Sequence, residues 1–296
     1  KDFRDLTNSD PTLSPFNDAL FNFVMEAMEQ AFSKAPIVIV NTLTNFEAEE
    51  VEVIASKHPC VYPIGPIHLL LKIIPQQSEI NSLGSNLWKE EVGCLPWLDS
   101  QDPSSIIYVN FGCLVTVTPK QLTEIAWGLV NCNHNFLWVV RPDLFADWEK
   151  SAMLSIDLRN HIKKRGFIAN WCPQEEVLNH ISIGVFLTHC GWNSILESVS
   201  SGVPMICRPF DGDQLMNCRQ VCTKWNVGIQ MEGDINRESV VMAVIRLMEG
   251  EEGRQMKEMV LKLKKLVHDV AASNNLSIIN LKMLINEMIF NFQLKD

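Results

Sequence analysis

The chain has 296 residues, of which 47% are hydrophobic and 20% charged, and its formal net charge is −10. This composition is typical of a globular protein with enough apolar side chains for a sizeable core. Nucleic acids and anionic membranes require clusters of Lys and Arg, so we expect neither as a partner. No apolar run approaches the roughly 18 residues that are needed to span a bilayer.

The nine cysteines show no spacing typical of a disulfide framework, a zinc knuckle or a thioredoxin-type pair. Cys190 and Cys207 lie in apolar, strand-like runs, where a thiol behaves as a small hydrophobic group. The first residues, Lys1 to Arg4, do not resemble a signal peptide. We therefore expect reduced thiols, a cytoplasmic location and no metal site.

The first third of the chain predicts a few short elements followed by a boundary. Helical apolar spacing covers residues 16–34 and 45–56, and strand-like runs cover residues 37–41 and 60–66. Residues 67–86 are loop-like and include Gln76-Gln77-Ser78, so we expect a domain boundary there.

Beyond residue 86 the pattern alternates between strands and helices. Strands are predicted over residues 105–111, 136–140, 166–170, 183–188 and 203–207. Helices are predicted over residues 119–131, 175–179, 193–200, 213–224, 237–249, 253–272 and 277–292, the last of them amphipathic. Short apolar strands that alternate with helices indicate an α/β fold with a parallel sheet covered on both faces.

A candidate anion site follows the strand predicted over residues 183–188. Ligands of such sheets bind at the carboxyl ends of the strands, where helix N-termini present N–H groups that attract phosphate. Gly191 permits a tight turn before the helix. The His189 imidazole, the Asn193 amide and the Ser194 hydroxyl add donors, which together suffice for a pyrophosphate without a metal.

Simpler explanations exist for each of these residues. Asn193 or Ser194 could only cap a helix, and Ser194 with Glu197 has the spacing of a capping box. Trp171 could be an ordinary core side chain, although its indole also offers a flat face for an aromatic ring. Asp213 could only cap the helix that follows it. The residues alone leave these alternatives open.

The segment 171–214, WCPQEEVLNHISIGVFLTHCGWNSILESVSSGVPMICRPFDGDQ, closely resembles the signature box of plant family 1 UDP-glycosyltransferases. Residues 85–91, 94–99 and 136–143 look like the branch that glucosylates cyanohydrins, terpenoid alcohols and iridoid aglycones. Residues 107–113 resemble the strand of that family that ends in Gly-Ser. The resemblance implies the GT-B fold, which consists of two Rossmann-like domains.

The resemblance also implies a domain organisation. Residues 1–66 look like the last part of the N-terminal acceptor domain, residues 67–86 like a linker, and residues 87–275 like the C-terminal UDP-sugar-binding domain. Residues 276–296 look like the C-terminal helix that packs back on the first domain. We therefore expect the donor domain to be complete and the acceptor domain to be largely absent.

The resemblance assigns roles to residues of the box. Trp171 stacks on uracil, while Gln174 and Glu197 contact the ribose, because a carboxylate can accept hydrogen bonds from two vicinal hydroxyls. The remaining UDP-binding positions are Cys113, Cys172, His189, Gly191, Trp192, Asn193 and Ser194. The sugar-binding positions are Trp192, Asp213 and Gln214, and Gln at the last position is associated with glucose.

Three positions depart from the pattern of the family. Cys113 replaces a Ser whose hydroxyl approaches the phosphates, and a thiol is a weaker donor. Arg208 and Asp211 stand where near relatives often have aromatic residues, and Asp211 adds a negative charge beside the sugar site. These departures bear on donor affinity and sugar identity more than on the fold.

The implied function is that of an inverting, metal-independent UDP-glucose-dependent O-glucosyltransferase, which acts on hydroxyls of small plant secondary metabolites. UDP-glucose is then a donor substrate and no cofactor is needed. The catalytic His of the family belongs to the part we expect to be absent, so no catalytic residue is assigned and this chain alone should be inactive. We expect a monomer at full length. The alternatives are a UDP-sugar-binding module without turnover and, less favoured, another sugar-nucleotide enzyme such as an epimerase.

Overall fold

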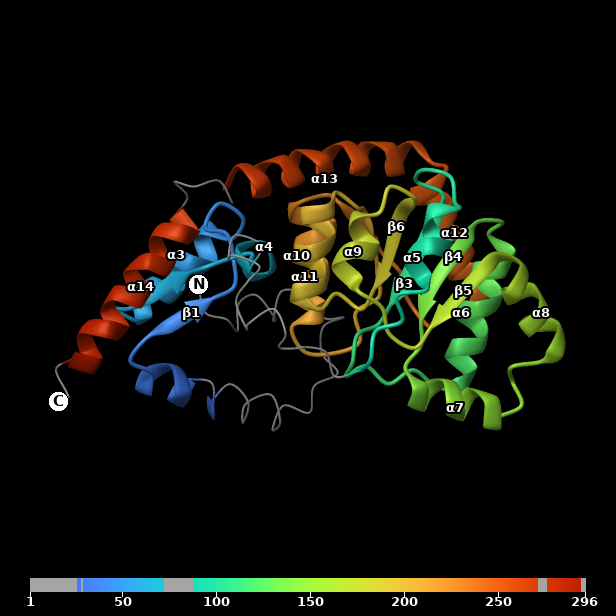
Figure 1. The fold of residues 1–296 in the computed structure, drawn as a ribbon, viewed down its shortest axis with the longest axis horizontal. Coiled ribbons are helices and arrows are strands. Elements are labelled where there is room, and N and C mark those ends of the chain that lie inside the picture. Colours follow the sequence, from blue (N-terminus) through green and yellow to red (C-terminus); the bar gives the residue numbers. More distant parts are fainter. Residues whose placement is uncertain (1–25, 28, 72–87, 271–275, 294–296) are drawn as a thin grey trace. The chain divides into compact units, whose positions relative to one another are not determined.

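The computed structural model describes residues 26–27, 29–71, 88–270 and 276–293. The chain divides into two compact units (Figure 1). One unit combines Lys1–Ser78 with Val267–Asp296, and the other comprises Glu79–Leu266.

The second unit is built on a six-stranded sheet with the order β5-β4-β3-β6-β7-β8. All adjacent strands in it are parallel. The strands are β3 (Ile106–Asn110), β4 (Asn135–Val139), β5 (Gly166–Ala169), β6 (Ile183–Thr188), β7 (Met205–Cys207) and β8 (Gly228–Gln230). The central strand β3 is buried at all five positions, as expected where helices cover both faces of a parallel sheet.

Helices lie on both sides of this sheet (Figure 1). One group contains α6 (Pro119–Asn131), α7 (Pro142–Lys150), α8 (Ile156–Arg165) and α12 (Arg237–Met248), and in it α6 contacts the other three. The other helices are α5 (Cys94–Asp99), α9 (Gln174–Asn179), α10 (Trp192–Ser201), α11 (Gln214–Arg219) and the π-helix η3 (Gln220–Lys224), and in this group α10 contacts α9 and α11. The long helix α13 (Glu251–Val270) contains the last residue of this unit, Leu266.

The strand order reverses between β3 and β6. From β3 the chain builds outward through β4 to β5, then returns to place β6 on the other side of β3 and continues to β7 and β8. Asn110, the last residue of β3, pairs with Thr188, the last residue of β6. The two strands therefore end at the same level, and the carboxyl edge at such a reversal is where doubly wound sheets bind ligands.

The first unit contains a parallel pair of strands, β1 (Val38–Val40) and β2 (Val61–Pro63), with helices α3 (Ala48–Lys57), α4 (Ile67–Leu71) and α14 (Leu276–Gln293). Helix α14 is tied to β2 and the turn after it. Ser277 Oγ donates to the Gly65 carbonyl at 2.8 Å, and Asn280 Nδ2 donates to the Pro63 carbonyl at 2.9 Å. A hydrogen bond to Glu287 raises the pKa of Tyr62 to about 12.

The predicted strands and most predicted helices are confirmed to within a few residues. Four elements of the second unit were not predicted, namely α5, α7, α8 and β8. Residues 67–71 were expected to be loop-like but form α4. Residues 16–25 of the first predicted helix and residues 72–86 of the expected linker lie outside the described residues.

The helix predicted over residues 213–224 is interrupted. It begins as α11 and widens into η3, where the Trp225 N–H donates to the Gln220 carbonyl five residues earlier at 2.9 Å. Such a π-turn accommodates one extra residue per turn. Periodicity alone does not reveal it, since a single wide turn scarcely changes the apolar spacing.

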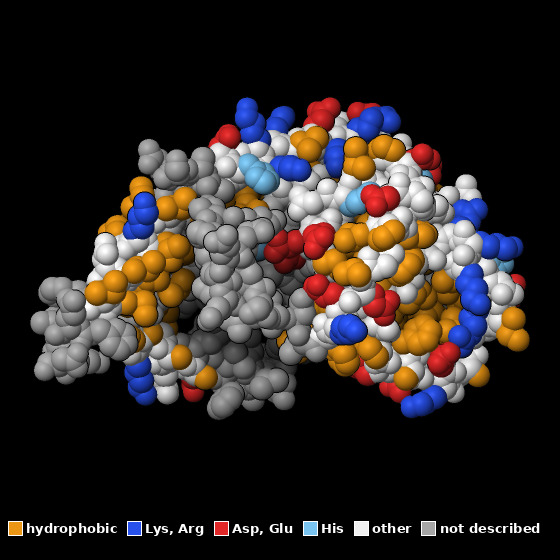
Figure 2. Space-filling model, in the orientation of Figure 1, with side chains coloured by type: hydrophobic (Ala, Val, Ile, Leu, Met, Phe, Trp, Pro, Cys, Tyr) orange, Lys and Arg blue, Asp and Glu red, His pale blue; other side chains and the backbone are white. Residues whose placement is uncertain are grey.

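Acidic and basic side chains are interspersed along α13, and Lys and Arg side chains follow one another along the right edge of the visible face (Figure 2). Within the described part of the chain, no helix is both long enough and apolar enough to cross a membrane.

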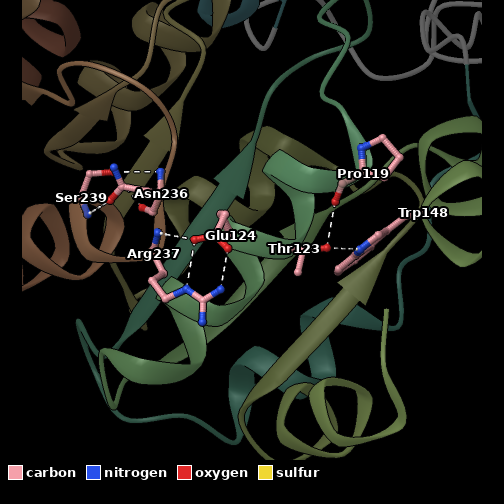
Figure 3. Close-up of polar contacts among 7 residues, drawn as sticks. All are labelled: Pro119, Thr123, Glu124, Trp148, Asn236, Arg237 and Ser239. Carbon is pink, nitrogen blue, oxygen red and sulfur yellow. Dashed lines mark hydrogen bonds and ion pairs between the residues drawn. The ribbon is translucent and has the colours of Figure 1, made fainter. Parts of the chain in front are cut away.

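Half-buried polar contacts join α6 to α12 and to α7 (Figure 3). Glu124 on α6 accepts hydrogen bonds from the Arg237 guanidinium at 2.5 and 3.0 Å and from the Arg237 backbone N–H at 3.0 Å. On the other side of α6, Thr123 Oγ1 accepts from Trp148 Nε1 at 2.9 Å. Hydrogen bonding to Arg237 lowers the pKa of Glu124.

We predict that Glu124→Gln lowers the free energy of unfolding by about 1 kcal/mol, because Gln cannot accept all three hydrogen bonds. Since the folded-state pKa of Glu124 is lowered from 4.5, its contribution is present above that value and is lost as pH falls through the folded-state pKa. Urea unfolding at several pH values measures both effects. Glu252→Gln, which breaks the more exposed pair with Arg246, is the control and should change stability little.

Candidate functional site

A pocket of about 310 Å³ lies at the carboxyl edge of the sheet. Its walls come from the segments that follow β3, β6 and β7. It is lined by Cys113, Leu114, His189, Gly191, Trp192, Asn193, Asp213 and Gln214. Apart from Leu114, every lining residue was predicted as a site residue from the sequence. The pocket therefore occupies the point at which the strand order reverses.

The imidazole of His189 lies between two glycines. A Cβ atom added at Gly112 would lie 2.8 Å from the ring, and one added at Gly191 would lie 2.4 Å from Nε2. Gly112 also has a φ of 72°, a conformation that favours glycine. Both positions thus need glycine for the ring to reach the pocket.

Burial dominates the electrostatics of His189. It lowers the pKa of the imidazole below the ordinary 6.5, although the backbone of Asn110 and the carboxylates of Asp213 and Asp211 oppose this effect. His189 Nδ1 is buried without a hydrogen-bond partner among the described residues. Neutral at pH 7, this ring is suited to donate to an anion or to gain a proton when one binds.

The start of α10 distinguishes between the alternatives left open by the sequence. Its N-cap is Gly191, and no side chain caps it. Asn193 and Ser194 were considered as caps, but both lie in the first turn of the helix. The capping box of Ser194 with Glu197 is therefore not formed. The positive end of the helix dipole consequently faces the pocket, which Gly191, Trp192 and Asn193 line.

Gln174 at the start of α9 holds Glu197 and Ser194 of α10. Its Nε2 donates to Glu197 Oε2 at 2.5 Å and to Ser194 Oγ at 3.0 Å. Its Oε1 accepts from Tyr108 Oη at 3.0 Å and from Asn110 Nδ2 at 2.8 Å. Because protein groups occupy both donor and acceptor positions of this amide, it orients Glu197 in this structure.

Tyr108 and Asn110, the other members of this network, were not predicted as site residues. Asn110 Nδ2 also donates to Tyr108 Oη at 3.0 Å, and Asn110 Oδ1 accepts from the Gly112 N–H at 2.9 Å. The two side chains lie on one face of β3, since residues two apart share a face. Their signal was a pair of polar side chains in an otherwise apolar buried strand.

Cys172 belongs to the core. Its side chain is 2% exposed, and its sulfur lies 3.2 Å from Tyr108 Oη. The ring of Tyr108 in turn stacks on Phe186, with centroids 4.8 Å apart. A ligand could therefore meet only the backbone of Cys172.

Asp213 and Gln214 lie at the beginning of α11. Asp213 occupies the N-cap position without a side-chain capping bond, and its Oδ2 accepts from Asn217 Nδ2 at 2.8 Å. Gln214 is 9% exposed, and its amide bonds to the Phe210 N–H at 2.9 Å and to Asp211 Oδ1 at 3.1 Å. Asp213 is exposed at the pocket, while Gln214 fixes the loop before α11.

Arg141, which lies two residues after the end of β4 and precedes α7, supports the opposite wall. Its Nη1 donates to the carbonyls of Cys113 and Val115, and its guanidinium also forms a double contact with Asp143 at 2.8 and 3.1 Å. The loop that carries Cys113 and Leu114 is thereby tied to β4. Arg141 was not predicted as a site residue, although its place after a strand was a signal.

The pocket lining lacks seven residues that were singled out in the sequence: Trp171, Cys172, Gln174, Ser194, Glu197, Arg208 and Asp211. Trp171 is half-buried, and its carbonyl accepts from the Glu91 N–H at 2.9 Å. Arg208 is half-buried, and its guanidinium carbon lies 5.6 Å from the centre of the Phe210 ring. The other six histidines do not line the pocket either.

Comparison with known proteins gives consistent matches. The family model described as UDP-glucoronosyl and UDP-glucosyl transferase matches residues 14–274. The chain is 43% identical to UDP-glycosyltransferase 85A1 of Arabidopsis thaliana over 99% of its length. It is 44% identical to 7-deoxyloganetin glucosyltransferase of Catharanthus roseus over 89% of its length, and 40% identical to (R)-mandelonitrile beta-glucosyltransferase of Prunus dulcis over 93%.

The chain spans 60%, 53% and 56% of these three relatives, respectively. Among solved structures, Os79 from O. sativa in complex with UDP superposes with a TM-score of 0.78 at 30% sequence identity. That match covers 87% of this chain and 57% of the Os79 chain.

We predict that Gln174→Ala lowers the free energy of unfolding by about 2 kcal/mol, because the Tyr108 hydroxyl and the Asn110 amide lose a common acceptor. Thermal or urea unfolding measures the change. Gln255→Ala, at an exposed position of α13, is the matched control and should be nearly neutral. If Gln174→Ala and Gln255→Ala have equal free energies of unfolding, the hydrogen bonds of Gln174 do not stabilise the fold.

Proposed function

This chain belongs to the UDP-glucoronosyl and UDP-glucosyl transferase family, and from that membership we propose that it binds a UDP-sugar in the pocket and serves glucosyl transfer to a small-molecule hydroxyl. The membership confirms the resemblance stated for residues 171–214, including the branch with cyanohydrin and iridoid relatives. The fold is that of the GT-B glycosyltransferases, as the resemblance implied.

The pocket itself carries the proposal. Its position beside the start of α10, with His189 and the positive helix end on one wall, suits a diphosphate. A UDP ligand is supported by the family relationship, since two named relatives are glucosyltransferases and Os79 is a similar structure in complex with UDP. We assign the diphosphate to His189, Asn193 and Ser194, with Cys113 approaching it from the opposite wall.

The nucleoside would extend toward α9. Glu197 is oriented by Gln174, so its carboxylate is suited to accept from the two ribose hydroxyls. Trp171, in the segment before α9, is our candidate for stacking on uracil. The structure modifies the role of Gln174, whose amide bonds to protein groups, and it limits Cys172 to contacts through the backbone.

The hexose would lie against Asp213 at the opposite end of the pocket. Its exposed carboxylate can accept from neighbouring sugar hydroxyls. Trp192 lines the same pocket, and its ring is tilted against Trp225 with centroids 5.9 Å apart. Gln214 keeps the loop of Asp211 in place, so a sugar contact from its amide would replace one of these hydrogen bonds.

In the transfer step an acceptor oxygen attacks the anomeric carbon, and the bond between that carbon and the β-phosphate oxygen of UDP breaks. Negative charge develops on UDP as it leaves. His189 and the first turn of α10 stabilise that charge. We assign no residue of this pocket as the base that removes the proton of the acceptor hydroxyl. The substrate class follows from the named relatives and is a hydroxyl group of a small metabolite.

We expect UDP-glucose to bind the purified chain in a saturable manner in calorimetry. Glu197→Gln should weaken binding about tenfold or more, because a carboxylate that pairs with two hydroxyls becomes a neutral amide. Trp171→Ala should also weaken binding through the loss of stacking. Glu176→Gln, at an exposed position of α9, is the control and should bind as the unmodified chain does.

Absence of binding by a folded sample would refute the proposed donor site. Binding without transfer to any hydroxyl acceptor would instead favour the alternative of a UDP-sugar-binding module. A radiolabelled-glucose transfer assay on the same sample separates these outcomes.

The affinity for UDP-glucose should rise as pH falls from about 7.5 to about 5.5. The pKa of His189 lies below 6.5 in the free protein, and a bound diphosphate raises it, so binding takes up a proton in this range. The experiment uses UDP-glucose rather than UDP, because the phosphates of UDP-glucose do not titrate between about pH 7.5 and about pH 5.5. His189→Gln should abolish the slope, and an unchanged slope in this variant would exclude His189 as the titrating group.

A further inference from the structure

Three buried cysteines meet beside the pocket. The sulfur atoms of Cys190, Cys207 and Cys218 all lie within 4.8 Å of one another. Each of these residues is at most 1% exposed. Cys190 lies two residues after the end of β6, Cys207 ends β7 and Cys218 lies on α11. The fold therefore gathers three thiols that are well separated in sequence.

A fourth thiol lies next to this thiol cluster. The sulfur of Cys222, one helical turn after Cys218, lies 3.9 Å from that of Cys218. Cys222 is half-buried, in contrast to the other three. Cys222 can therefore serve as a fourth ligand, and it is the thiol of the group that is nearest to solvent.

The four thiols differ in acidity. Hydrogen bonds from the neighbouring thiols, together with the guanidinium of Arg208, lower the pKa of Cys218. Burial raises the pKa of Cys190, and hydrogen bonds within the cluster raise the pKa values of Cys207 and Cys222. Arg208 directly follows Cys207, and its Nε is buried without a hydrogen-bond partner among the described residues. A cation beside the sulfurs can compensate the surplus charge of a group of thiolates.

We propose that Cys190, Cys207 and Cys218 form a binding site for a thiophilic d¹⁰ metal ion of the Zn²⁺ and Cd²⁺ class, with Cys222 as a possible fourth ligand. Zn–S bonds of about 2.3 Å in a tetrahedral site place sulfurs about 3.8 Å apart. The observed separations approach this value, so small side-chain rotations are enough. Nothing in the cysteine spacing indicated the site, because the ligands come from three different elements.

Metal binding would exchange the thiol protons for the metal ion. The ion forms one bond to each of the three sulfurs, and every ligand that was a thiol releases its proton to solvent. A divalent ion with three thiolates carries one net negative charge, which Arg208 can offset. The affinity for the metal should consequently rise with pH.

Occupancy would link the elements that carry the pocket. Cys190 stands between His189 and Gly191, and Cys218 lies on the helix that begins at Gln214. A metal at the thiol cluster would cross-link the ends of β6 and β7 to α11. Because a ligand that binds only the folded state stabilises it, the metal should raise the melting temperature.

The test uses the full chain, fully reduced and free of metal, titrated with Cd²⁺. Thiolate-to-cadmium charge-transfer absorption should saturate at one equivalent, and the melting temperature should rise. Cys207→Ala and Cys218→Ala should each lose affinity by more than the roughly 10- to 100-fold that loss of an outer-shell partner costs. Cys132→Ala, which removes a thiol that is 3% exposed and lies outside the thiol cluster, should bind as the unmodified chain does.

Equal cadmium binding by Cys207→Ala and the unmodified chain would overturn the proposal, and so would the lack of a tight equivalent in the folded, unmodified chain. In that case the four thiols serve only as small apolar core groups. If the variants do not fold, cadmium-113 NMR of the unmodified chain decides. A chemical shift typical of three or four sulfur ligands supports the site, and one typical of fewer sulfurs overturns it.

Discussion

The parallel pairing of β3 with β6 is the constraint on which the pocket depends. The register that places Asn110 opposite Thr188 makes both strands end at one level. The chain must then leave β3 toward one side of the sheet and β6 toward the other, because their crossover helices lead to β4 and β7 respectively. The segments after the two strands diverge, and residues of both segments line the pocket at this edge.

Polar groups at this edge are organised by the sheet itself. Tyr108 and Asn110 are buried in β3 and would destabilise the fold without partners. Gln174 supplies a common acceptor, and its own donors are used by Ser194 and Glu197. The same hydrogen bonds therefore satisfy the buried strand and orient the carboxylate that we assign to the ribose. Stability and the proposed ribose contact depend here on one network.

The thiol cluster and the pocket share the turn that follows β6. Cys190 has a φ of 68°, so the chain turns sharply between His189 and Gly191. The turn directs the thiol into the core while His189 lines the pocket. A change in the packing or ligation of that thiol acts on the same turn that places the imidazole. A change at the buried thiol of Cys190 should therefore alter the position of His189 in the pocket.

The sequence by itself determined most strands and helices of the second unit to within a few residues, the family, and all pocket-lining residues except Leu114, but it missed α5, α7, α8 and β8. It could do so because strand periodicity, the glycines of the turns and the helix starts are local properties, and because the box of residues 171–214 is contiguous. Only the tertiary structure showed that Gln174 bonds to Tyr108 and Asn110, that Arg141 holds the loop of Cys113, and that three distant cysteines meet. These contacts join elements far apart in the chain, and strand order and register, which no local pattern records, bring them together.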